Sequence, residues 1–74
     1  MKPTALGYYL LVLPDRGSAN GWEVAMFSRG GRWQAGVCLP SKAAAHAERR
    51  KLVRHHKRLA AEQAARAETR RVRA

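Results

Sequence analysis

The residues from Lys42 to about Arg71 constrain the fold of this chain most strongly. This tract consists almost entirely of Ala, Arg, Lys, Glu, Gln, Leu and His, which favour helix, and it has few β-branched residues. Ser41 is a suitable N-cap, and Pro40 lies just outside the helix. The sequence therefore predicts one helix over residues 41–72, about 45 Å long at 1.5 Å per residue.

Placing the helical residues at 100° intervals separates two faces in the first half of this helix. One broad stripe is apolar and should pack on the rest of the protein, with His46 and His55 at the borders of the opposite face. The apolar stripe holds Ala45, Leu52, Val53, His56, Leu59 and Ala60. The opposite face holds the cations Arg50, Lys51, Arg54, Lys57 and Arg58.

The sequence predicts strands and turns in the first half of the chain. Tyr8 to Leu13 is apolar on both sides, which predicts a strand that is central or covered on both faces. The segment GWEVAMFSRGGRWQAGVCL has Gly30-Gly31 at its centre, typical of a hairpin with a two-residue loop. That loop predicts the pairs Arg29–Arg32, Ser28–Trp33, Met26–Ala35, Val24–Val37 and Trp22–Leu39.

This register gives the hairpin an apolar and a polar face. The inward face would hold both tryptophans, and we expect these to be core residues rather than surfaces for base stacking. The outward face would hold Glu23, Phe27, Arg29, Arg32 and Gln34. Phe27, flanked there by two arginines, is a candidate contact for a partner.

Together these segments predict a single α+β domain over residues 1–74. A three-stranded antiparallel β-meander over residues 7–39 is followed by one long C-terminal helix that packs on the sheet. Strands of seven or eight residues span only about 25 Å, and past residue 60 arginines replace the apolar stripe, so the last turns should overhang the sheet.

The charge of the chain points to an acidic partner. The net charge is +10, of which residues 41–74 supply +8, with eleven Lys or Arg against three acids. A helix that is merely solvated usually mixes signs, so we expect binding to a polyanion or an acidic protein patch. The candidate partner-binding residues are Phe27, Arg29, Arg32, Arg50, Lys51, Arg54, Lys57, Arg58, Arg66 and Arg70.

Several other classes of protein are disfavoured. The run ALGYYLLVL is too short to span a bilayer and resembles a signal peptide only faintly, and few bulky apolar residues are free to bind a membrane, so a cytoplasmic protein is expected. The single Cys38 predicts no intramolecular disulfide, and the three histidines lack the i,i+4 spacing of a helical zinc site. We see no set of nucleophile, base and orienting residue, so we expect a non-enzyme without metal or cofactor.

The segment YYLLVLPDRGSANGWEVAMFSRGGRWQAGVCLP resembles the small β-meanders of proteins from bacteriophages and other mobile elements. The small size and lack of a catalytic set are also similar to anti-CRISPR proteins. That resemblance implies a stoichiometric inhibitor that docks on a host protein or nucleoprotein complex, for example a CRISPR–Cas effector, and blocks it. The alternative is an accessory protein that binds RNA or DNA through phosphates, because no sequence-reading nucleic-acid motif is present. Oligomeric state is left open.

Overall fold

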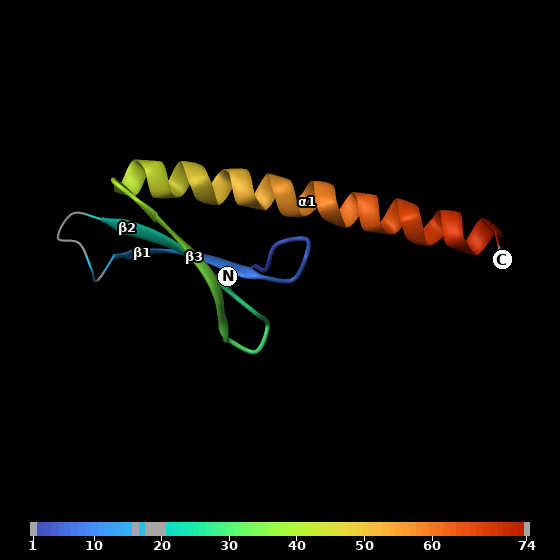
Figure 1. Ribbon diagram of the computed structural model, residues 1–74, viewed down its shortest axis with the longest axis horizontal. Coiled ribbons are helices and arrows are strands. Elements are labelled where there is room, and N and C mark those ends of the chain that lie inside the picture. The colour runs from blue at the N-terminus through green and yellow to red at the C-terminus, as the bar shows by residue number, and fades with distance from the viewer. Residues whose placement is uncertain (1, 16, 18–20, 74) are drawn as a thin grey trace.

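The computed structural model contains a three-stranded sheet and one long helix (Figure 1). It describes residues 2–15, 17 and 21–73, and the side chains of the helix as far as residue 68. The elements are β1 (Tyr9–Pro14), β2 (Trp22–Phe27), β3 (Trp33–Leu39) and α1 (Lys42–Arg73). The predicted α+β class, the β-meander and the helix that follows it are confirmed. The predicted loop through Ser18, Ala19 and Asn20 lies outside the described residues.

The strand order is β1-β2-β3, with both neighbouring pairs antiparallel. β2 is therefore the central strand, and the prediction that the first strand would be central or covered on both faces is wrong. β1 lies at an edge because each strand follows its neighbour by a hairpin connection. Alternate side chains of the apolar β1 therefore lie on the face of the sheet that α1 does not cover.

The hairpin between β2 and β3 has a three-residue loop instead of the predicted two-residue loop. Ser28 N–H donates to the Arg32 carbonyl at 2.8 Å, and Gly31 N–H donates to the Ser28 carbonyl at 3.0 Å. Gly31 has a φ of 82°, the left-handed conformation that such a loop needs before the returning strand. Ser28 therefore pairs with Arg32, one residue away from the predicted pairing.

A β-bulge next to this loop shifts the register back by one residue, so that the rest of the hairpin pairs as predicted. The pairs Trp22–Leu39, Val24–Val37 and Met26–Ala35 form as predicted, but Phe27 lies opposite Trp33, so that Gln34 is an extra residue on β3. Because paired residues share a face, Trp33 lies beside Phe27 and not beside Val24 and Met26. The prediction that both tryptophans face the core is wrong for Trp33, which is 59% exposed.

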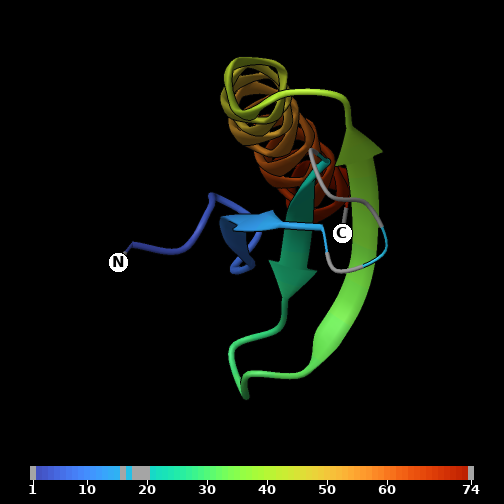
Figure 2. The same ribbon diagram turned by 90° about the vertical axis from the view of Figure 1, so that its left-hand side faces the viewer.

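The sheet has one face covered by α1, the helix face, and one uncovered face, the open face. The helix face carries Leu10, Val24, Met26, Ala35 and Val37, and α1 packs across it (Figures 1 and 2). The open face carries the alternate residues, Tyr9, Leu11, Leu13, Glu23, Ala25, Phe27, Trp33, Gly36 and Cys38. No other element covers the open face in the described part of the chain.

The core is small and sits where α1 crosses β1 and β2. The buried apolar residues there are Leu10, Val24 and Ala45, and Ala25 is buried on the open face between Leu11 and Gly36. Ala45 permits the close approach of the helix because it is fully buried and has a small side chain. At the start of α1, the Ser41 hydroxyl accepts a hydrogen bond from Ala44 N–H at 3.1 Å, which confirms Ser41 as the N-cap. The helix then runs past the end of the sheet, and the molecule measures 56 × 24 × 19 Å (Figure 1).

Candidate polyanion-binding face

Five cations form the outer surface of the docked half of α1, and this surface is called the cationic face. They are Arg50, Lys51, Arg54, Lys57 and Arg58, and the structure places all five in exposed positions, as the sequence predicts. At 100° per residue they lie within an arc of about 120° and along about 12 Å of the helix. The cationic face is therefore a compact strip of like charge.

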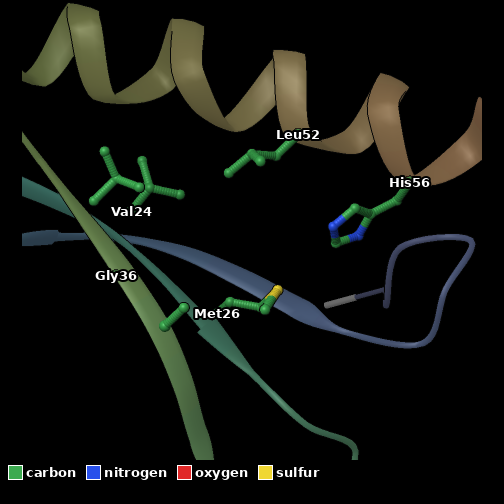
Figure 3. A pocket seen from close by; sticks show the side chains of 7 residues that line it. Val24, Met26, Gly36, Leu52 and His56 are labelled. Atoms are coloured by element: carbon green, nitrogen blue, oxygen red, sulfur yellow. The ribbon is translucent and has the colours of Figure 1, made fainter. Parts of the chain in front are cut away.

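The packing of α1 keeps the cationic face turned to solvent. His56, on the opposite stripe, is buried with 6% exposure, and Leu52 points toward the sheet beside it (Figure 3). Arg49 is half-buried and donates from Nε to the Leu10 carbonyl at 2.9 Å. This charged hydrogen bond ties α1 to β1, so the rotation of the helix about its own axis is set.

Acidic residues near the cationic face are few. Glu48 is half-buried, and the next acid along α1 is Glu62, a full turn beyond Arg58. Within the described side chains, no acid pairs with any of the five cations. Their charges are therefore available to an external anion. Arg66 is exposed but lies on another side of α1, and the side chain of Arg70 is outside the described residues.

The predicted contact residues of the hairpin form a separate surface at the end of the sheet away from α1 (Figures 1 and 2). Arg29 and Arg32 are exposed, and Phe27 is half-buried. The Arg29 guanidinium lies over Gly7, with Nε 3.1 Å from the position a Cβ would take there. Trp33, which the sequence analysis assigned to the core, joins this surface instead. The candidate residues thus divide between the helix and the hairpin.

Trp22 is half-buried on the helix face, and the Lys42 Nζ lies 5.4 Å from the centroid of its ring. This cation–π contact joins the first turn of α1 to the start of β2. The prediction of an inward position therefore holds for Trp22.

His56 links the N-terminal segment to the helix. Thr4 Oγ1 lies 2.7 Å from His56 Nδ1, and the Tyr8 ring packs edge-on at a centroid distance of 5.8 Å. Burial, with a smaller contribution from the charge of neighbouring His55, lowers the pKa of His56 below its usual value of 6.5. The imidazole is thus a neutral structural group at neutral pH.

One cluster of side chains was missed by the sequence analysis. Asp15, Glu23 and Cys38 offer a carboxylate oxygen each and a thiol, and these atoms all lie within 4.8 Å of one another. The Glu23–Cys38 pair follows from the strand register, but the approach of Asp15 depends on how the chain leaves β1. The negative charge of Asp15 is the main reason that the pKa of the Cys38 thiol is raised above 9.0, with burial and Glu23 adding to it. The thiol is therefore protonated and weakly nucleophilic near neutral pH.

A shallow apolar groove of about 180 Å³ lies between α1 and β3 (Figure 3). Its walls are Val24, Met26, Ala35, Gly36, Val37, Leu52 and His56. His56 is the one titratable residue among them, and its Nδ1 already contacts Thr4. The groove therefore presents apolar surface and no constellation of reacting groups.

No helix in the described part of the chain is long and apolar enough to cross a membrane. The apolar N-terminal run that resembles a signal peptide contributes strand β1.

Comparison of the chain with protein-family models, with curated proteins and with solved structures gives no match.

Proposed function

We propose that this protein is a non-enzymatic nucleic-acid-binding protein that docks the cationic face of α1 on a phosphate backbone. One observation carries the proposal: the five cations of that face are exposed together, with no acid paired to them in the described structure. Duplex DNA carries about one charge per 1.7 Å of axis, so about seven phosphates lie along the 12 Å that the five cations span. The match in charge density favours a phosphate backbone.

The chemistry of the cationic face distinguishes nucleic acid from a protein partner. Protein interfaces concentrate their binding energy in buried aromatic, arginine and large apolar anchors. Between Arg50 and Arg58 the exposed residues are cations and His55, with no large apolar side chain. Contacts of this kind position a protein on phosphates without reading base sequence. The acceptor can be free RNA or DNA, or the exposed nucleic acid of a nucleoprotein complex that the protein blocks, as the resemblance to anti-CRISPR inhibitors implies.

The proposal predicts a strong dependence on salt. Each phosphate contact releases condensed counterions, so the logarithm of the association constant should fall linearly with the logarithm of salt concentration. A face of five cations predicts a slope of about −3.5 on a single strand to −4.5 on a duplex. The affinity should depend little on base sequence.

The test is a fluorescence-anisotropy titration of labelled duplex and single-stranded oligonucleotides over a salt series. Arg54→Gln, Lys57→Gln and Arg58→Gln should each weaken binding by similar factors and reduce the salt slope by about one unit. Lys2→Gln is the matched control, because it removes the same charge from an exposed position outside α1. Equal effects of Lys2→Gln and the helix variants would contradict a specific cationic face. A loss concentrated in one helix variant would contradict phosphate contacts distributed along the cationic face.

A further inference from the structure

We infer that the open face of the sheet binds a second copy of this chain, in a two-fold symmetric pair of sheets with an α1 helix on each outer side. The inference does not depend on the proposed binding of nucleic acid. It rests on the composition of the open face and on the placement of charge at the two ends of the sheet.

The open face is apolar where a solvated face would be polar. Antiparallel sheets with one face in water usually alternate apolar and polar residues along each strand. In β1, however, the open face receives Tyr9, Leu11 and Leu13, and it continues into Phe27 and Trp33 on the neighbouring strands. Trp33 is 59% and Leu13 38% exposed, and Leu13 lies opposite Glu23 in the strand register. Contiguous apolar surface of this kind typically marks a protein interface.

The accessible surface of the chain is larger than that of a compact monomer of the same mass. The accessible surface is 5830 Å², whereas a compact monomer of 8.3 kDa has about 4,600 Å². The radius of gyration is 15.4 Å, against about 11 Å for a compact chain of this length. The overhang of α1 accounts for part of the excess. The described side chains of α1 from Ala61 to Glu68 are all exposed, whereas an interface of standard size covers about 800 Å² per partner.

The charges at the ends of the sheet select a second copy as the occupant. Asp15 and Glu23 lie at one end of the sheet, and Arg29 and Arg32 lie at the hairpin end. In a two-fold pair each residue contacts the same set of residues in reverse, so the surface must be self-complementary. With the strands of the two copies antiparallel, the acidic end of one sheet meets the basic end of the other. Glu23 lies on the open face with Asp15 within 4.8 Å of it, and the loop with Arg29 and Arg32 follows Phe27 of that face, so the two ends carry opposite charge.

In this pair the contact between the open faces and the cationic faces of the helices lie on opposite sides of each sheet. α1 lies on the opposite side of the sheet from the contact (Figure 2), and its five outer cations are exposed, so the like charges of the two copies point away from one another. Two copies would then present two cationic faces in opposite directions. If these bind nucleic acid as proposed, the pair can bridge two segments and gain avidity from that geometry.

The experiment measures the mass of the full chain in solution by sedimentation equilibrium, without nucleic acid. The wild-type protein should have about twice the mass of 8.3 kDa at a concentration of about 100 µM, above the micromolar Kd of weak interfaces. Glu23→Lys alone and Arg29→Glu alone should each weaken the pair by about tenfold or more, because each places like charges opposite one another twice. An equimolar mixture of the two variants should restore it, since both contacts then join opposite charges and the mean net charge equals that of the wild type.

Substitutions on the two faces of the sheet provide a second readout. Trp33→Lys should give a monomer, whereas Val37→Lys should remain paired, because Val37 is 44% exposed but lies on the helix face. Circular dichroism melting checks that each variant is folded. A monomeric wild-type protein, a mixture of charge variants that does not associate, or equal effects of Trp33→Lys and Val37→Lys would each overturn the inference. None of these outcomes depends on binding of nucleic acid.

Discussion

Val24 and Val37 face one another across β2 and β3, and this pair tests where α1 covers the sheet. Val24 is 2% exposed, whereas Val37, its register partner on the same face, is 44% exposed. Truncation of Val24 to Ala removes two buried methyl groups, each stabilising by about 0.8 kcal/mol, and leaves a cavity whose walls relax only partly. We therefore expect Val24→Ala to lower the free energy of unfolding by about 2 kcal/mol.

The matched variant, Val37→Ala, should lower it by only about 0.8 kcal/mol, because nearly half of that side chain is already in water. For a domain of this size 1 kcal/mol shifts the Tm by about 4–8 °C. Thermal unfolding followed by circular dichroism should thus give a drop of roughly 8–16 °C for Val24→Ala and at most about 6 °C for Val37→Ala. Equal shifts would refute the reasoning, since they would mean that α1 covers β3 as fully as β2.

Three further predictions concern single side chains. Arg49→Gln should lower the free energy of unfolding in urea by about 1.5 kcal/mol, through loss of its charged hydrogen bond to β1, while Arg50→Gln should change it little. Because burial lowers the pKa of His56, the folded state binds fewer protons than the unfolded state. Stability should therefore fall as the pH drops below the unfolded value of about 6.5, and His56→Gln should flatten that dependence in pH-resolved melting curves. The Cys38 thiol should react slowly with a disulfide reagent at pH 8, and Asp15→Asn should accelerate the reaction by lowering the raised pKa; an unchanged rate would contradict the assigned cause.

Much of the architecture follows from short-range patterns in the sequence. The helix, its N-cap at Ser41 and the exposure of its five outer cations depend on the 3.6-residue period and on backbone groups within one turn, so the sequence alone determines them. The pairing of Val24 with Val37 matches the prediction although the predicted loop is wrong, because the additional loop residue and the extra residue of the bulge, Gln34, offset one another. The proposed use of the cationic face follows from the 3.6-residue period of α1, because the spacing of the charged residues decides which side of the helix carries them.

Only the tertiary structure decided which residues the sheet leaves uncovered. A three-residue loop and the bulge at Gln34 move Trp33 to the open face, and both depend on a balance of turn geometry and strand pairing that spacing does not resolve. β1 is an edge strand with an uncovered apolar face, although its composition favours a buried one. The cluster of Asp15 with Cys38 joins residues far apart in the sequence. The periodicity of one segment reports the environment of its own side chains, but the partner that covers them is set by the path of the whole chain.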